Sequence, residues 1–513
     1  MVAHIRSSKA TELSRNTWFL PPLAALVDGG PDELGDGSGR RQMNGSVDDG
    51  EGWIDFGDFS VKMGWMECLC GGRYFRDWNG RFNGEGGRII RGRTGDVITQ
   101  QRPLAKIGKV VMQDKNSATF LSFIGNLDKR VELDKNIKHG DIRYYGALSM
   151  MASKASYENK AYIETTVNDH WKMEFLDSYD FWNEYQKKAT TQAFILREKN
   201  VDSEMIIVAF RGTESFDADA WCTDFDISWY ELRDIGKVHS GFTKALGMQN
   251  KADWPEDISW ADDQPAPAYY AIRKLLIGLL QGNDRARFIL TGHSLGGALA
   301  ILFPAVLAYH REKWDWLLER LEGVYTFGQP RVGDEQFGEF MKKKLEKHKV
   351  KYYRFVYGYD MVPRLPYDGS TLMFKHFGTC VYFNSFYEGK VVGEQPNKNY
   401  FSPSSFIPKI INAAWELIRS LIIPYTKGPE YKEGFLLLVL RLIGLVIAGV
   451  PAHSPQDYVN ATRLGSSNVY VSLDDQSHQQ TINLERKTIA GATFSCIPST
   501  QLAFQGDQKL VVG

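Results

Sequence analysis

Cysteine is scarce in this sequence of 513 residues, and its scarcity argues against a disulfide-stapled protein. The five cysteines are scattered along the chain, at Cys68, Cys70, Cys222, Cys380 and Cys496. An odd number at wide spacing does not build a disulfide framework and favours a reducing compartment. Cys68 and Cys70 have no second cysteine pair at metal-binding spacing, so we do not expect a zinc site.

An excess of charge of either sign is missing as well. Lysine and arginine number 61 against 62 aspartates and glutamates, which leaves a formal net charge of −1. Electrostatics therefore gives no reason to expect nucleic acid or an acidic membrane surface as a partner. Residues 1–16 lack the apolar run of a secretory signal, so we expect the protein inside the cell rather than secreted.

Uninterrupted apolar stretches are also short. Phe435–Val450 is almost wholly apolar, but it is shorter than the roughly 20 residues that span a membrane. Arg441 stands near its middle, where a charge would be costly in hydrocarbon. The sequence therefore does not predict a transmembrane helix here.

Composition divides the chain into four parts. Residues 1–56 are predicted to be a disordered arm, because Asp28–Gly52 is rich in Gly, Asp and Ser and has little to bury. Residues 57–139 form an N-terminal extension, and at 57–100 aromatic residues and arginines lie among glycines. Such a stretch can stack on single-stranded RNA, but it is more often a loop-rich surface segment. A compact domain is expected at 140–465, followed by a C-terminal tail at 466–513.

The compact domain alternates helical segments with short β-rich runs. Helices are predicted at Tyr144–Tyr157, Phe181–Lys187, Pro267–Gln281 and Phe337–His348. Strands are predicted at Thr191–Leu196, Glu204–Phe210, Arg287–Leu290, Gly323–Phe327 and Tyr352–Val356. Alternation of this kind indicates an α/β fold with a mostly parallel sheet and functional groups at the strand ends.

The sequence GHSLG at 292–296 joins one of these strands to a helix of small and then apolar residues. This is the G-x-S-x-G spacing of a nucleophile elbow, a sharp turn that leaves no room for flanking side chains. Ser294 would be the nucleophile, and the Leu295 N–H would stabilise an oxyanion at the helix N-terminus. Thr213 follows the strand Glu204–Phe210 and is a candidate for the second oxyanion donor. A simple hydroxyl-capped turn is the alternative for Thr213.

A serine hydroxyl needs a base and a carboxylate that orients the base. In the α/β-hydrolase order the acid follows the serine and the histidine comes last. Asp334 and Asp360 both follow predicted strands, and spacing alone leaves both open as the acid. Of the later histidines, His376 lies in a β-rich run and His478 in a polar tail. His453 lies in a loop, where a triad histidine is expected.

Six segments carry a family resemblance. They read FRGTES, VHSGF, TGHSLGGALA, TFGQPRVGD, YDMVPRLP and AHSPQDY, in this order along the chain. Their order and approximate spacing resemble the class 3 lipases, and the chain looks most like the plant triacylglycerol lipases of oil bodies. The resemblance covers roughly Asp141–Gly465 and implies an α/β-hydrolase fold.

The resemblance also implies roles for individual residues. It makes Ser294 the nucleophile, Asp360 the acid and His453 the base, and it places Thr213 and the Leu295 N–H in the oxyanion hole. The reaction would be acyl transfer from a lipid ester through an acyl-enzyme, with no metal or organic cofactor. A phospholipase A1 or galactolipase that acts on polar lipids is the alternative enzyme. A lipase-like scaffold that binds a partner without catalysis is the alternative outside enzymes.

The same resemblance gives Glu214–Cys222 the place of the lid. Phe216 and Trp221 flank a short segment beside the oxyanion position. We expect this segment to cover the site in water and to open on lipid.

Residues 405–450 predict how the protein meets lipid. Phe406–Ile423 has the spacing of an amphipathic helix. Asp360 precedes this region and His453 follows it, so a single membrane crossing between them would put the two on opposite sides. We therefore expect a peripheral, monotopic attachment to a lipid droplet or membrane surface. The alternative is that Phe435–Val450 is a buried core helix.

Overall fold

The computed structural model describes residues 114–473, except 201–202, 214–227, 249–252, 261–263, 311–312 and 370–372. By their contacts these residues all belong to one compact unit, Phe56–Gly513. The predicted arm, most of the predicted extension and most of the predicted tail lie outside the described residues.

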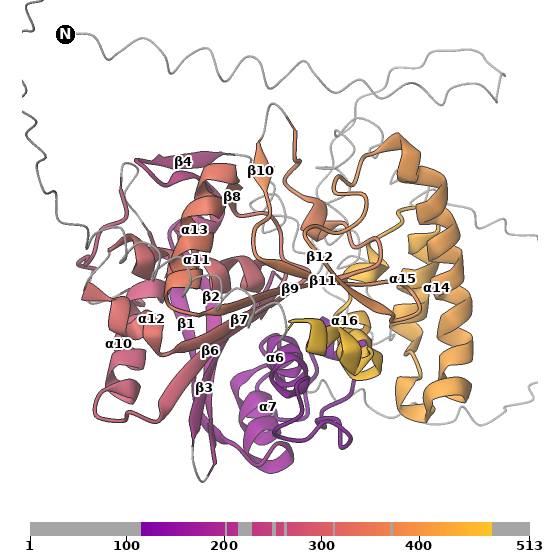
Figure 1. The fold of residues 1–513 in the computed structure, drawn as a ribbon. Helices are drawn as coiled ribbons and strands as arrows, with labels where there is room; N and C mark the ends of the chain where they lie inside the picture. Colours follow the sequence, from indigo (N-terminus) through magenta and orange to yellow (C-terminus); the bar gives the residue numbers. More distant parts are fainter. Residues whose placement is uncertain are drawn as a thin grey trace, which may run out of the picture. The chain divides into compact units, whose positions relative to one another are not determined.

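An eight-stranded sheet forms the centre of this unit, in the order β1-β2-β3-β6-β7-β9-β11-β12 (Figure 1). Its strands are β1 (Glu174–Asn183), β2 (Lys188–Lys199), β3 (Glu204–Phe210), β6 (Ala286–His293), β7 (Leu321–Phe327), β9 (Lys351–Tyr357), β11 (Thr379–Phe383) and β12 (Gly389–Val392). Strands β3, β6, β7, β9 and β11 pair in parallel, whereas β1, β2 and β12 add antiparallel edges. The predicted α/β fold with a mostly parallel sheet is confirmed.

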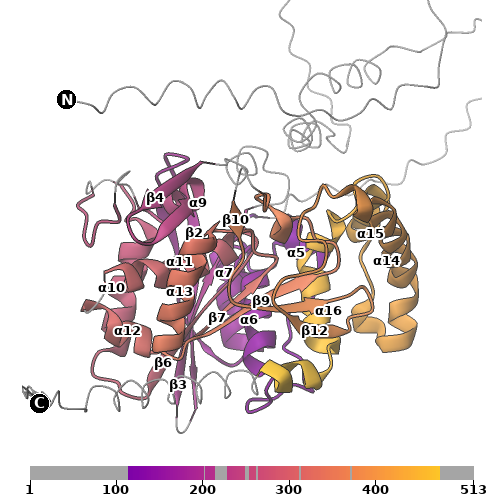
Figure 2. The ribbon, with the colours of Figure 1, turned by 45° about the horizontal axis from the view of Figure 1, so that its top comes forward.

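Helices cover both faces of the sheet, because the side chains of each central strand alternate between two apolar clusters. On β3, Ile206 and Val208 belong to one cluster, and Ile207 and Ala209 belong to the other. The first cluster includes α10 (Ala268–Leu280), α11 (Leu295–Tyr309), α12 (Asp315–Glu319) and α13 (Glu335–Lys347). The second includes α6 (Tyr144–Ala155) and α16 (Pro455–Leu464), which lie across the sheet from α10 and α12 (Figures 1 and 2).

Short elements complete the unit. The helices among them are α5 (Phe123–Leu127), α7 (Lys160–Thr165), the π-helical turn η1 (Thr166–His170), α9 (Ser240–Ala245), and the 3-10 turns η3 (Val362–Arg364), η4 (Pro403–Ser405), η5 (Pro429–Tyr431) and η6 (Pro451–His453). A small second sheet has the order β10-β8-β5-β4, made of β10 (Phe374–Lys375), β8 (Gly333–Asp334), β5 (Gly236–His239) and β4 (Trp229–Leu232).

The helix predicted at Phe181–Lys187 is wrong. Phe181 lies in β1, opposite Thr191 of β2, and the chain then turns back into β2. The Asn183 side chain accepts the N–H groups of Tyr185 and Gln186 at 3.0 and 3.2 Å and so stabilises this turn. Short local spacing suggested a helix, but pairing with the neighbouring strand decides the conformation.

Two helices lie side by side near β11 and β12, at one end of the large sheet (Figures 1 and 2). They are α14 (Phe406–Lys427) and α15 (Phe435–Gly444). The predicted amphipathic helix at Phe406–Ile423 is confirmed and runs one turn further. Within the described part of the chain, no helix combines the length and the apolar character that crossing a bilayer requires.

Residues on both sides of the predicted 140–465 domain pack onto it. Ile124 and Leu127 of α5 share an apolar cluster with Leu437 and Leu440 of α15. Beyond the other limit, residues 467–473 are helical, and the Tyr470 ring lies 6.3 Å from that of Phe355.

The glycines of the strand-to-helix turn at 292–296 give a first prediction. A Cβ on Gly296 would lie 2.3 Å from the carbonyl oxygen of Phe210, and this backbone atom belongs to a central strand. We expect Gly296→Ala to lower the free energy of unfolding by about 1–3 kcal/mol, the usual cost of overpacking a core.

Gly278→Ala is the matched control, measured by the same urea denaturation. Gly278 lies in α10, and a Cβ there meets no atom within 4 Å. This change should stabilise the protein by about 0.5–1 kcal/mol. Equal effects of the two changes would contradict the close contact at the turn.

Candidate active site

Ser294 stands between strand β6 and helix α11 in a strained backbone conformation. Its φ is 58° and its ψ is −130°, a region that residues other than glycine rarely adopt. The Ser294 N–H donates to the Phe327 carbonyl at the end of β7, at 2.9 Å. A Cβ on Gly292 would lie 2.2 Å from the Gly296 carbonyl carbon, so the turn closes only with glycine there. This local geometry is that of a nucleophile elbow.

Asp360 and His453 form a hydrogen-bonded pair beside this turn. The His453 Nδ1 lies 2.8 Å from Asp360 Oδ2, and both residues are buried. Asp360 follows β9, and His453 ends the turn η6 that precedes α16. A Cβ on Gly328 would meet both partners within about 3 Å, and Gly328 follows the residue that binds the Ser294 N–H. The structure therefore brings the three predicted triad residues together at one end of β7.

His293 ties the backbone of His453 to the turn at Ser294. The two imidazole rings are stacked with centroids 4.5 Å apart, and His293 Nε2 lies 3.0 Å from the His453 carbonyl oxygen. Burial, reinforced by the neighbouring His453, lowers the pKa of His293 well below its usual value. A neutral His293 that donates through Nε2 accepts at Nδ1, where the Tyr157 hydroxyl lies 2.8 Å away. This chain of contacts fixes the spacing between the base and the nucleophile.

The carboxylate of Asp360 has two further donors. The Tyr458 hydroxyl donates to Oδ2 at 2.5 Å, and the Val362 N–H donates to Oδ1 at 2.9 Å. Burial and the Asp360 charge raise the pKa of the Tyr458 hydroxyl well above its usual value, so it remains a donor. Both carboxylate oxygens are thus held in place from the protein side.

A buried arginine shapes the loop that carries Asp360. Arg364 donates to the Gly358 carbonyl at 2.9 Å and also to the carbonyl of Asp360 itself. It reaches across to the carbonyls of Pro396 and Asn397, each at 2.9 Å. One guanidinium therefore stabilises the loop and its contact with a distant segment.

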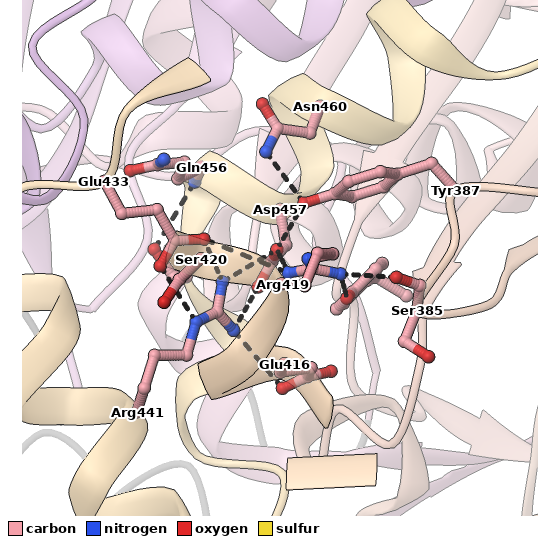
Figure 3. Close-up of polar contacts among 12 residues, drawn as sticks. Ser385, Tyr387, Glu416, Arg419, Ser420, Glu433, Arg441, Gln456, Asp457 and Asn460 are labelled. Carbon is pink, nitrogen blue, oxygen red and sulfur yellow. Dashed lines mark hydrogen bonds and ion pairs between the residues drawn. The ribbon is translucent and has the colours of Figure 1, made fainter. Parts of the chain in front are cut away.

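A cluster of buried charges joins α14, α15 and α16 (Figure 3). Asp457 of α16 binds Arg441 of α15 through Oδ2 and Nη1 at 2.8 Å, and it binds Arg419 of α14 at the same distance. Glu433 lies 2.9 Å from Arg441, and Glu416 lies 3.2 Å from it. Burial alone would raise the pKa of Asp457, but the two arginines outweigh burial and lower it.

The two oxyanion candidates lie at the same edge of the sheet. Leu295 is the first residue of α11, and Thr213 follows the end of β3. The two segments lie close together, because a Cβ on Gly296 would lie 3.0 Å from the Arg211 carbonyl carbon. Thr213 therefore follows a strand whose end lies against the start of the helix.

Asp334 and His376, the other candidates for acid and base, have structural partners. Asp334 is the N-cap of α13, and its Oδ1 accepts the Phe337 N–H at 2.9 Å. His376 is half-buried, and its Nε2 lies 2.7 Å from the Pro363 carbonyl oxygen.

The predicted lid lies outside the described residues. Phe216 and Trp221 both fall in the gap at 214–227. His478 also falls outside, beyond residue 473. The lid remains a prediction from the resemblance.

Several supporting residues escaped prediction from the sequence. Tyr458 and Arg364 stand inside two of the motifs quoted above, AHSPQDY and YDMVPRLP, yet neither received a role. Their place inside these motifs was the available signal. Tyr157 gave no such signal, because its contact with His293 spans 136 residues.

Tyr458 gives the prediction of this site. Tyr458→Phe removes the donor to Asp360, and a hydrogen bond to a charged group is worth about 1.5–3 kcal/mol. We expect kcat to fall roughly tenfold with KM unchanged, because Tyr458 contacts the carboxylate and not the ester. Steady-state kinetics on a short-chain ester measures both constants.

Tyr470→Phe is the control, because the buried Tyr470 hydroxyl has no hydrogen-bond partner among the described residues. It should leave kcat unchanged. If both substitutions lower kcat alike, the Tyr458 contact does not position the acid.

Comparison with known proteins identifies the family of this chain. The family model described as "Lipase (class 3)" matches residues 207–370. Triacylglycerol lipase OBL1 of Nicotiana tabacum is 43% identical over 434 residues, covering 70% of this chain and 75% of that protein. The protein of the same name from Arabidopsis thaliana is 43% identical over 394 residues, covering 70% of this chain and 76% of that protein.

Triacylglycerol lipase OBL1 of Ricinus communis is 38% identical over 403 residues, and it covers 68% of this chain and 76% of that protein. In all three, the similarity extends over about two thirds or more of both chains. Motifs, fold and relatives agree: the chain belongs to the class 3 lipase family.

Proposed function

We propose that this protein is a serine lipase that hydrolyses triacylglycerol through the triad Ser294, Asp360 and His453. The observation that supports this most directly is the His453–Asp360 hydrogen bond of 2.8 Å beside a strained serine turn. A glycine-rich structural turn alone would not require a buried histidine–carboxylate pair at its side. The names of the three plant relatives support triacylglycerol as the substrate.

In this mechanism His453 takes the proton of the Ser294 hydroxyl as the oxygen attacks the ester carbonyl. Asp360 orients the imidazole through Nδ1 and stabilises its charged form. The oxyanion of the tetrahedral intermediate is bound by the Leu295 N–H at the start of α11 and by Thr213. His453 then protonates the departing alcohol, and water releases the fatty acid from the acyl-enzyme by the same steps in reverse.

We infer that the lipase acts at the surface of a lipid droplet inside the cell. Triacylglycerol is insoluble, so the enzyme has to meet it at an interface. The resemblance to the oil-body lipases supports this place, and a peripheral attachment is compatible with a triad whose members lie before and after α14 and α15.

Polar membrane lipids are the alternative substrate, since the same triad would cleave the acyl ester of a phospholipid or a galactolipid. These substrates differ in the alcohol part of the ester, so the part of the pocket that binds the alcohol distinguishes them. A bulky charged or sugar headgroup needs polar partners when it is desolvated.

A substrate panel tests the proposal. Purified full-length protein is assayed side by side on emulsified triolein, phosphatidylcholine and monogalactosyl diacylglycerol, with released fatty acid as the measurement. We expect kcat/KM on triolein to exceed the other two by about tenfold or more, the discrimination that one unsatisfied polar group produces. Preference for either polar lipid would replace triacylglycerol as the substrate.

The triad itself is tested by single substitutions. Ser294→Ala and His453→Ala should each reduce turnover by about 10⁶-fold, the cost of losing either member from a serine hydrolase. Ser294→Ala should also abolish labelling by a serine-directed phosphonate. His376→Ala is the control, because its imidazole binds the Pro363 carbonyl, and it should lower stability but keep turnover. An inactive, folded His376 variant beside an active His453 variant would reverse the assignment.

A further inference from the structure

Helix α14 buries its charged residues and exposes many of its apolar residues, which is the reverse of the usual arrangement. The charged side chains of Lys409, Glu416 and Arg419 are buried against the protein. On the outer side, Ile407, Ile411 and Leu421 are 68%, 64% and 60% exposed. A helix of a water-soluble domain turns its apolar stripe inward, so this arrangement calls for a different surrounding on the outside.

The apolar face continues onto α15 and carries almost no charge. Phe435 begins α15 and Val446 lies just beyond its end, and they are 83% and 84% exposed. Arg441, the one charged residue between them, is buried. Every charged side chain of α14 before its last residue, Lys427, is also buried. Together the two helices present an apolar face without exposed ionic groups over most of their length. We call it the α14–α15 face.

Ion pairs hold these helices to the protein from the inner side. Figure 3 shows Arg419 and Arg441 converging on Asp457 of α16, with Glu416 and Glu433 beside them. The loss of one partner from a buried pair of this kind strongly destabilises the folded protein. Because polar contacts provide this attachment, most of the aliphatic side chains of α14 remain outside and available.

The helices are also fixed close to the catalytic acid. Glu416 Oε1 would lie 3.4 Å from a Cβ on Gly358, two residues before Asp360. At the other end, a Cβ on Gly449 would lie 2.4 Å from the Tyr359 carbonyl oxygen. The α14–α15 face is therefore attached directly to the loop that carries Asp360.

We propose that the α14–α15 face inserts into the hydrocarbon of the lipid monolayer that covers the substrate droplet, and so attaches the enzyme beside its site. This inference rests on the proposed function, which supplies the lipid surface. A protein partner would be expected to find arginines and a polar rim, which this face lacks. Hydrocarbon, in contrast, excludes exposed charge and accepts aliphatic and aromatic side chains. The buried polar stripe runs along α14, so the helix lies in the surface rather than across it.

Flotation tests the proposal with full-length protein and artificial droplets of triolein coated with phosphatidylcholine. Wild-type protein should float with the droplets at low and at high salt, because the face has no exposed charge to screen. The double variant Ile411→Glu/Ile418→Glu should lose about a hundredfold in partition coefficient, roughly tenfold for each buried aliphatic side chain. Ile142→Glu/Val471→Glu, at exposed positions outside the two helices, is the matched control and should bind as the wild type does.

Each other result overturns the proposal. Unchanged flotation of Ile411→Glu/Ile418→Glu shows that the face does not carry binding, and equal losses in both variants show that the effect is not local. A wild-type dimer in lipid-free buffer that the double variant converts to a monomer, with unchanged flotation, assigns the face to a second copy of the chain.

A water-soluble short-chain ester separates this proposal from the proposed function. All variants should hydrolyse it at the wild-type rate, because the substituted residues lie outside the triad and its supporting contacts. If the wild-type protein fails on every ester, the proposed function falls, while flotation still decides what the face binds.

Discussion

The hydrogen bond between His453 and Asp360 joins residues that are 93 positions apart, and much of the structure follows from the need to close that loop. The chain leaves the end of β9 at Asp360, builds β11, β12, α14 and α15, and returns to the same place at His453. Both ends are held by neighbours of the pair: Arg364 binds the outgoing loop, and His293 binds the returning carbonyl. The chain between Asp360 and His453 must therefore begin and end at the same place in the structure.

The site is supported by hydrogen bonds that hold its side chains in place rather than by many groups that would touch a substrate. Tyr458 and the Val362 N–H donate to the Asp360 carboxylate, and the His453 carbonyl sets the tautomer of His293, to which Tyr157 donates. Preorganisation of this kind is how a serine hydrolase avoids reorientation during reaction. The geometry of the site also depends on the position of α16, because Tyr458 and Asp457 belong to this helix and lie one turn after His453.

The elbow could be predicted from sequence because close backbone contacts leave no room for a side chain at positions 292 and 296, and this requirement appears as glycines at a fixed spacing from Ser294. The strands β2, β3, β6, β7 and β9 could be predicted because each contains a short apolar run. The choice between Asp334 and Asp360 could not come from spacing, because both follow strands; the distinction lies in which one meets a histidine 93 residues later. The error at Phe181 has the same origin, because a partner strand decided the conformation. The ion cluster could not be predicted from the sequence either, because its five members come from α14, α15, α16 and the segment between α14 and α15.

That cluster also limits how this part of the molecule can change over time. If α14 and α15 were deleted together, Asp457 would be left without its two arginines. If they were transplanted to another protein, two arginines and two glutamates would arrive without the aspartate that completes them. Either event therefore requires a simultaneous substitution at the position of Asp457, in the helix that follows His453. The helical pair is thus not an interchangeable module, and its ancestry should be inseparable from that of helix α16.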